Sequence, residues 1–324
     1  MNTIFSLKPN LKEKVWGGTK LADRYNKAKP GTNIGESWEI SAHTDGEATI
    51  ENGEFAGKTL LEASQEKPEI LGSYPKQLGY FPILTKFIDA TRALSVQVHP
   101  KDDYARKYEN DNGKTEMWFI IDSEPGAKIY LGPKEELNKE EILESLEAGT
   151  FIDLLRGFEV KPGDCFYVPA GTIHAIGAGC LVYEVQQSSN VTYRLYDYKR
   201  PDKDGNLREL HVDKSLDVLD PKPVDEKFVS LEKDRLSGEE KLFHGKNFQV
   251  DLVYLEGERD LSVGAESFLA LTLLKGSASA HRDKDSVNLV AGKSIFAPAG
   301  DKDLTLYGNG LAIVTRVKAN DAQV

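Results

Sequence analysis

One spacing occurs twice in the chain and constrains its fold more than any other feature. The stretch from Gly163 to His174 follows the pattern G-x5-P-x-G-x2-H, and the stretch from Gly292 to Asp303 repeats it with aspartate at the last position. Each begins with a glycine turn, continues as a short strand-like run and ends in a P-x-G turn. The repeat indicates one β module used twice, of which the first copy keeps a metal-type ligand and the second has lost it.

Short strand-like segments separated by turn residues fill most of the chain, so we expect a mainly β fold of the sandwich or barrel type. Apolar residues recur at helical spacing over 60–72 and, more strongly, over 135–157. Asn138 is a suitable N-cap within the second stretch. We therefore predict a short helical insertion between strands near 135–157.

A charged, proline-containing segment over 217–228 is typical of a linker, and strand-like runs resume after it. The 324 residues of the chain suffice for two domains. We predict a larger catalytic domain over 1–225 and a smaller β domain over 226–324 that has no metal ligands.

The formal net charge of -11 argues against nucleic acid or an anionic membrane as the main partner, although a pocket can still be locally basic. The two cysteines, Cys165 and Cys180, form no CxxC pair and are typical of buried thiols in a reducing compartment. The N-terminal segment lacks the apolar region of a signal peptide, and no apolar run approaches the roughly 18 residues of a membrane helix. We expect a cytoplasmic protein.

The segment 95–100, SVQVHP, places polar side chains on one face of a predicted strand. Side chains alternate along a strand, so Gln97 and His99 share a face, which is either an ordinary wet face or the floor of a site. Glu116 enters a mostly apolar run and is costly to bury without a partner, and His174 follows the P-x-G turn. One metal ion would satisfy the Gln97 oxygen, His99, Glu116 and His174 together.

This nitrogen and oxygen ligand set suits Zn²⁺, with Fe²⁺ or Mn²⁺ as alternatives. Two neutral imidazoles, an amide and one carboxylate would leave a divalent site at about +1, which could stabilise a developing enediolate or alkoxide. Structural zinc sites more often use cysteine, so the set favours a functional metal. Simpler interpretations stay open: histidines at the surface or hydrogen-bonded in the core, an edge-strand salt bridge at Glu116, and a cross-strand ion pair between Glu184 and Arg194.

Seven motifs, in order, resemble those of one family: VWGG, GESWEIS, LTKFIDA, LSVQVHP, GKTEMWFI, VPAGTIHAIGAG and EVQQSSNVTYRLYDY. Together they resemble type I mannose-6-phosphate isomerase, a zinc-dependent enzyme of the cupin superfamily that interconverts mannose 6-phosphate and fructose 6-phosphate. The resemblance implies cupin (jelly-roll) β-sandwich domains, the first with the short helical insertion. The chain lacks the large helical domain of longer members and is similar to the compact bacterial form.

The resemblance also implies roles for individual residues. With one Zn²⁺ per chain, the family's zinc ligands fall on Gln97, His99, Glu116 and His174. The family's active-site arginine falls on Arg194 and its lysine on Lys114. Generic cupins have histidine where Gln97 stands and place their glutamate closer to His99, so both departures favour the isomerase over oxidase or dioxygenase cupins.

Isomerisation of an aldose to a ketose moves a proton between C2 and C1 through an enediol, and this transfer needs a base. Lys114 is our candidate, because a nearby divalent ion disfavours its ammonium form. Arg194 would stabilise the enediolate or hold substrate oxygens. The phosphate needs cations, for which Arg194, Lys101 and Arg92 are the candidates. Weaker candidates for the rest of the pocket are Trp16, Trp118 and Glu184.

Two other functions stay open at this point: an iron or manganese oxygenase of cupin fold, and a non-catalytic cupin that binds a sugar phosphate. The first would depend on O₂, and the second would bind without turnover. As partners we expect a small-molecule sugar phosphate and no nucleic acid or membrane, with the protein a monomer or weak homodimer.

Overall fold

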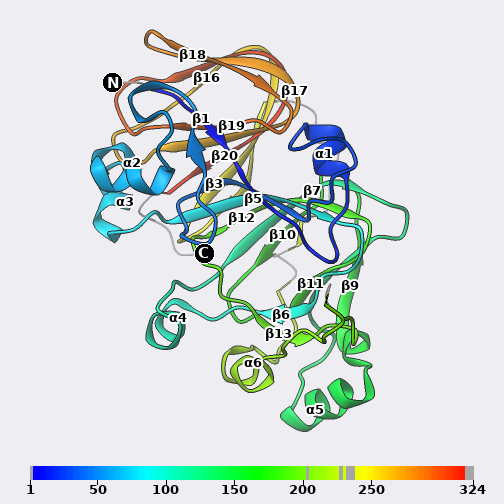
Figure 1. Ribbon diagram of the computed structural model, residues 1–324. Helices are drawn as coiled ribbons and strands as arrows, with labels where there is room; N and C mark the ends of the chain where they lie inside the picture. The colour runs from blue at the N-terminus through cyan, green and yellow to red at the C-terminus, as the bar shows by residue number, and fades with distance from the viewer. Residues whose placement is uncertain (1–2, 202–203, 226–228, 231–237, 318–324) are drawn as a thin grey trace.

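The computed structural model describes residues 3–201, 204–225, 229–230 and 238–317, and the strands of this part form three antiparallel sheets (Figure 1). A seven-stranded sheet lies in the middle, in the order β14-β10-β7-β12-β5-β3-β2. Its strands are β2 (Asn10–Lys12), β3 (Glu36–Ser41), β5 (Ile83–Ala90), β7 (Glu116–Ser123), β10 (Cys165–Val168), β12 (Cys180–Gln187) and β14 (Val229–Ser230).

A five-stranded sheet faces one side of the central sheet, in the order β13-β6-β11-β8-β9. Its strands are β6 (Val96–Val98), β8 (Lys128–Pro133), β9 (Leu155–Glu159), β11 (His174–Ile176) and β13 (Tyr193–Tyr196). Buried side chains from both sheets, such as Trp118 and Val182 from one and Ile129 and Ile176 from the other, form a common core. The mainly β sandwich predicted from the sequence is therefore confirmed.

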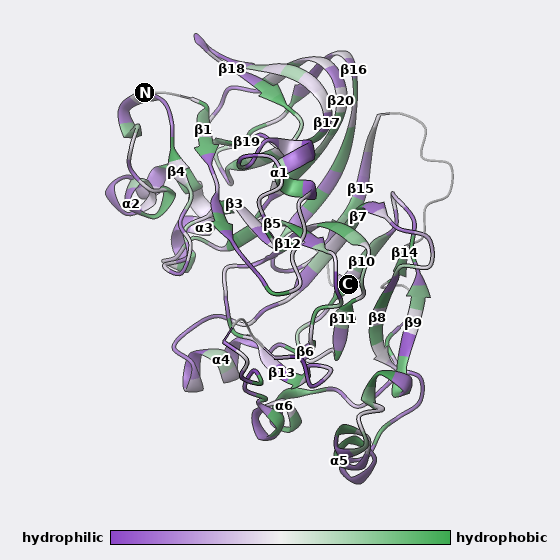
Figure 2. Cartoon of the chain, turned by 45° about the vertical axis from the view of Figure 1, so that its right-hand side comes forward, coloured by the Kyte–Doolittle hydropathy of each residue, from purple (hydrophilic) through white to green (hydrophobic). Residues whose placement is uncertain are grey.

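An eight-stranded sheet covers the opposite side of the central sheet, in the order β15-β16-β20-β17-β19-β1-β4 with β18 beside β17. Its strands are β1 (Phe5–Lys8), β4 (Thr49–Ile50), β15 (Glu239–His244), β16 (Gln249–Leu261), β17 (Leu269–Arg282), β18 (Asp285–Val290), β19 (Ser294–Ala297) and β20 (Leu304–Arg316). Met117, Phe119 and Tyr183 of the central sheet share a core with Val250 and Phe296 of this sheet. Hydrophobic residues follow the strands between the stacked sheets (Figure 2).

Two strands from the start of the chain belong to the eight-stranded sheet. Leu7 of β1 is paired with Ser294 of β19 on one side and with Ile50 of β4 on the other. The predicted division of the chain at residue 225 stays a prediction, and the strand pairing crosses it. The second copy of the repeated module is thus paired directly with the N-terminal segment.

The helices lie at the margins of the sheets (Figure 1). They are α1 (Lys20–Tyr25), α2 (Leu60–Glu66), α3 (Ser73–Leu78), α4 (Asp102–Tyr108), α5 (Lys139–Ala148) and α6 (Val212–Val218), with single 3₁₀ turns at Gly53–Phe55, Pro68–Leu71 and Phe151–Leu154. No helix among the described residues is long and apolar enough to span a membrane.

The predicted helical insertion forms, and its start follows from local chemistry. Asn138 caps α5: its side chain accepts the backbone N–H of Glu141, whose own carboxylate accepts the Asn138 backbone N–H. Ile142 of this helix packs with Phe151 and Val98 on the outer face of the five-stranded sheet. The insertion therefore closes the sandwich on the side away from the central sheet.

Candidate metal centre and active-site cavity

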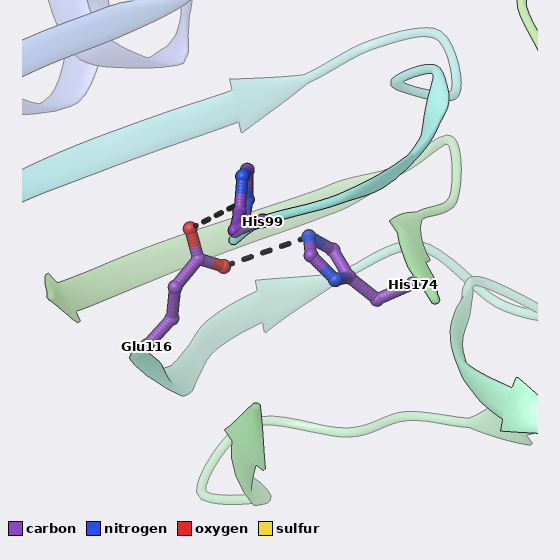
Figure 3. A group of neighbouring side chains, drawn as sticks. All are labelled: His99, Glu116 and His174. Atoms are coloured by element: carbon purple, nitrogen blue, oxygen red, sulfur yellow. Dashed lines mark ion pairs between the residues drawn. The ribbon is translucent and has the colours of Figure 1, made fainter. Parts of the chain in front are cut away.

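His99, Glu116 and His174 meet inside the sandwich, although they come from three different segments (Figure 3). His99 directly follows β6, Glu116 begins β7 of the central sheet, and His174 begins β11. One potential ligand atom from each residue lies within 4.8 Å of the others. Among the described residues, this is the only such group of three or more histidine, cysteine or acidic side chains.

Each imidazole is oriented by a backbone carbonyl. Nδ1 of His99 lies 2.8 Å from the Val191 carbonyl oxygen, and Nδ1 of His174 lies 2.9 Å from that of Thr172. A carbonyl oxygen can only accept, so each Nδ1 carries the proton and each Nε2 presents a lone pair. Both Nε2 atoms point toward Glu116, at 3.2 Å for His99 and 3.8 Å for His174. This is the arrangement that metal-ligating histidines adopt.

Electrostatics keep the three groups in the forms that bind a cation. Burial, together with the positive charge of Lys114, lowers the pKa of His99 to about 3, and burial lowers the pKa of His174. Burial also opposes ionisation of Glu116, but the Lys114 ammonium and the imidazoles outweigh it and hold the pKa of that carboxyl well below its usual range. Neutral imidazoles and an ionised carboxylate are what a metal site needs.

The donor set fits a divalent metal on the geometry of the chain itself. Oε2 of Glu116 is buried without a hydrogen-bond partner among the described residues. Nε2 of His174 faces this oxygen, and Nε2 of His99 faces Oε1 of the same carboxylate. The amide nitrogen of Gln97 lies 3.3 Å from Nε2 of His174, and a half-turn of the amide brings its oxygen to the same place. Lys114 brings a cation into contact with this cluster, through Oε1 of Glu116 and, at 3.1 Å, Nε2 of His99.

A cavity of about 320 Å³ opens beside this cluster. Five of the residues predicted for the site line it: Gln97, Lys114, Arg194, Trp16 and Glu184. Five basic side chains and two acidic ones line it in all, which makes it locally basic on an acidic protein. The charge suits an anionic small molecule.

Three of the weaker pocket candidates do not line this cavity. Trp118 is fully buried behind it, where its indole N–H donates to Oε2 of Glu184 at 2.8 Å. Arg92 and Lys101 are exposed, with Lys101 at the start of α4. Neither Arg92 nor Lys101 is therefore part of the cavity wall, whereas Trp118 supports Glu184, which is.

Sequence reasoning passed over four charged residues of the cavity wall: Lys14, Glu36, Lys86 and Arg208. Lys86 lies on β5 and is almost fully buried, with its Nζ 3.0 Å from Glu184. Burial opposes its charge, but Glu184 and Glu36 outweigh that effect and raise the pKa of Lys86. Lys86 could have been identified from the sequence, because it is a lysine within the apolar run ILTKFIDA. The same reasoning singled out Glu116.

The cross-strand ion pair between Glu184 and Arg194 considered from the sequence is wrong. Glu184 lies on β12 of the central sheet and Arg194 on β13 of the five-stranded sheet, so the two strands are not neighbours. Glu184 pairs with Lys86, and Arg194 donates through Nη1 to the Glu209 carbonyl at 2.7 Å. Both side chains instead face the same cavity.

Comparison with known proteins decides the family. The mannose-6-phosphate isomerase ManA of Bacillus subtilis is 40% identical over 306 residues, which cover 94% of this chain and 93% of that protein. The family model for the catalytic domain of type I phosphomannose isomerase matches residues 4–129. This chain belongs to the type I phosphomannose isomerase family.

Solved structures of the family share its fold along the whole chain. A crystal structure of mannose 6-phosphate isomerase from Bacillus subtilis matches with a TM-score of 0.86 at 37% identity and covers 97% of this chain and 99% of its own. The structure of a putative mannosephosphate isomerase from Archaeoglobus fulgidus matches with a TM-score of 0.80 at 29% identity, covering 98% of both chains. The predicted cupin fold and the predicted enzyme family are therefore confirmed.

Proposed function

We propose that this isomerase interconverts mannose 6-phosphate and fructose 6-phosphate through an enediol, with one Zn²⁺ held by Gln97, His99, Glu116 and His174. The observation that carries the proposal is the buried group of His99, Glu116 and His174, whose lone pairs converge beside a basic cavity. Converging buried acceptors are costly, above all Oε2 of Glu116, which has no donor among the described residues, and a cation relieves that cost.

A zinc ion at this position would supply a Lewis acid that stabilises negative charge on the oxygens at C1 and C2 and disfavours the ammonium form of Lys114. The protein's own side chains carry out the proton transfer. Lys114 takes the proton from C2 at its Nζ and returns it to C1, while a hydroxyl proton passes from O2 to O1. Lys114 lines the cavity and is otherwise almost fully buried, so bulk water cannot easily compete for that proton.

Arg194 and Trp16 complete the wall in this proposal. Arg194 is the cross-strand neighbour of Gln97 and lines the cavity, so its guanidinium is positioned to hold substrate oxygens on the side of the cavity beyond the metal ligands. Trp16 is only 4% exposed and closes the cavity with an apolar ring. We also propose that the protein acts in the cytoplasm as a monomer or weak homodimer.

A coupled assay tests the proposal directly. Purified protein is supplied with mannose 6-phosphate, and fructose 6-phosphate is detected; metal content is measured on the same sample. We expect turnover, about one zinc per chain and complete loss of turnover on chelation. Turnover that survives full metal removal would rule out the metal role. Consumption of O₂ would instead indicate an oxygenase, and binding without turnover a sugar-phosphate sensor.

The role of Lys114 has its own test. Lys114→Met should retain zinc but lose the exchange of the substrate C2 proton with solvent, followed by NMR in deuterated water. The matched control is Lys76→Met, which removes an exposed lysine paired with Glu69 and should leave exchange unchanged. Normal exchange in Lys114→Met would exclude Lys114 as the base.

A further inference from the structure

Two arginines, Arg194 and Arg208, line the same cavity and come from adjoining segments. Across the five-stranded sheet, His174 is paired with Gln97, and Gln97 with Arg194. The backbone N–H of His211 then donates to the Arg194 carbonyl at 2.7 Å, so the segment carrying Arg208 runs along the free edge of β13. Arg208 therefore enters the cavity from the side farther from His174.

A buried carboxylate fixes the guanidinium of Arg208. Asp197 is 4% exposed, and its Oδ2 accepts Nε of Arg208 at 2.6 Å while its Oδ1 accepts Nη2 of the same group. Oδ1 also accepts Nη2 of Arg200 at 2.7 Å, and Arg200 is tied by Nη1 to the Ala93 carbonyl at 2.8 Å. This bidentate contact uses one edge of the Arg208 fork, and Nη1 donates to none of the described residues.

The arginine side of the cavity lacks the carboxylate partners that its lysines have. Lys14 lies 3.2 Å from Glu36 and Lys86 lies 3.0 Å from Glu184, so these cations are neutralised in pairs. Around the arginines, by contrast, Asp197 is the one carboxylate of the described residues that forms an ion pair, and it serves both Arg200 and Arg208.

Arg194 has an unsatisfied donor in the same place. Its Nε is buried without a hydrogen-bond partner. Burial, together with the positive charge of Arg208, lowers the pKa of Arg194, which reflects two cations close together with too few anions. A multiply charged oxyanion with several acceptor oxygens, such as a phosphate group, would satisfy the free donors of both guanidinium groups at once.

We propose that Arg208 and Arg194 bind the phosphate of the substrate, with Asp197 as a positioning residue that fixes Arg208. The inference rests on the proposed function, since it assigns one end of that substrate. The reacting carbons then lie at the metal ligands and the phosphate at the outer edge of β13. Arg208 takes the place of Arg92 and Lys101, which lie outside the cavity.

Steady-state kinetics on the zinc-loaded protein test this assignment. Arg208→Ala should raise the KM for mannose 6-phosphate about 10- to 100-fold, because charge-assisted hydrogen bonds are lost, with a change in kcat below about threefold. Arg208→Lys should fall between, since it keeps the charge and loses the fork. The matched control is Arg106→Ala, which removes an arginine of α4 that is 54% exposed, and its KM should equal that of the wild type. An unchanged KM in Arg208→Ala overturns the assignment.

Asp197→Asn separates positioning from simple folding. It should raise the KM and leave kcat of the folded enzyme nearly unchanged, whereas a merely structural role would lower the amount of active enzyme at constant KM. That second result overturns the role of Asp197.

Calorimetric titration with inorganic phosphate makes the two proposals distinguishable. We expect the wild type to bind phosphate and Arg208→Ala to bind it at least about tenfold more weakly. If the wild type does not convert mannose 6-phosphate but this difference holds, the proposed function fails and the phosphate site stands. If the wild type turns over and neither KM nor phosphate affinity depends on Arg208, the phosphate site fails and the function stands.

Discussion

Gly163 and Gly292 begin the two copies of the repeated module, and their backbones agree closely. Their φ angles are +98° and +89°, a region that favours glycine, and each is followed by a four-residue strand, β10 and β19. The side chains at the ends differ in environment. His174 is 1% exposed and points at Glu116, whereas Asp303 is exposed and accepts the backbone N–H of Val263 at 3.3 Å.

The second copy has different surroundings and contacts the central sheet from the side of the eight-stranded sheet. The hydroxyl of Ser294 donates to Oε2 of Glu39 at 2.7 Å, and Glu39 also lies 2.7 Å from Nζ of Lys27. Nζ of Lys27 donates in turn to the carbonyl of Gly292 at 2.5 Å. The module therefore determines a strand and a turn, while its chemistry depends on which side chains of other strands lie next to it.

Loss of the ligand at the end of the first copy should have the largest effect. His174→Ala removes one imidazole from a buried group, so we expect loss of bound zinc and a fall in turnover of about 10³-fold, which metal analysis and the coupled assay would measure. Asp303→Ala is the matched change in the second copy and should leave metal content and turnover at wild-type levels. Equal losses in the two variants would contradict the difference drawn between the copies.

Loss of the buried ion pair between Lys27 and Glu39, next to the second copy, should lower stability rather than turnover. The Lys27 and Glu39 side chains are 7% and 0% exposed, so Lys27→Met leaves a buried carboxylate unpaired and should cost about 3–5 kcal/mol in the free energy of unfolding. Turnover per folded molecule should stay near that of the wild type. Urea denaturation measures the first quantity and the coupled assay the second.

The control for this variant is a surface pair of the same module. Lys293→Met breaks a contact with Glu51 whose side chains are 26% and 39% exposed, and should cost less than about 1 kcal/mol. Comparable losses of unfolding free energy in Lys27→Met and Lys293→Met would show that the buried network stabilises the fold no more than a surface ion pair does.

Much of the fold follows from local patterns. Alternation along the strand segments, the Asn138 cap and the glycine turns are local, and the corresponding elements form as expected. The pairing of β1 with β19 is not a local property, because it joins residues nearly 300 positions apart and depends on which buried faces meet. Strand patterns alone therefore predicted a mainly β fold of the sandwich or barrel type, but not the pairing of the N-terminal strands β1 and β4 within the eight-stranded sheet.

The site divides in the same way. Gln97, His99, Glu116 and His174 stand in motifs that periodicity and family resemblance mark, and the structure brings them together. Arg208 follows the last motif at a distance and reaches the cavity only because a hairpin returns along β13, with Pro201 bridged to Leu207. Arg92 and Lys101 were chosen for their charge, but both are exposed and neither lines the cavity, which no spacing along the chain could show.

The smallest effect should come from placing histidine at the last position of the second copy, where Asp303 stands. Asp303→His makes the second copy match the pattern of the first, yet we expect no second zinc by metal analysis and no change in turnover. The position is exposed and lies near Arg282, whose guanidinium offers only donors and no lone pair for a metal. A second zinc in Asp303→His would show that the module itself encodes a metal site. Its absence would show that His174 binds zinc only because the strands carrying Gln97, His99 and Glu116 converge on it.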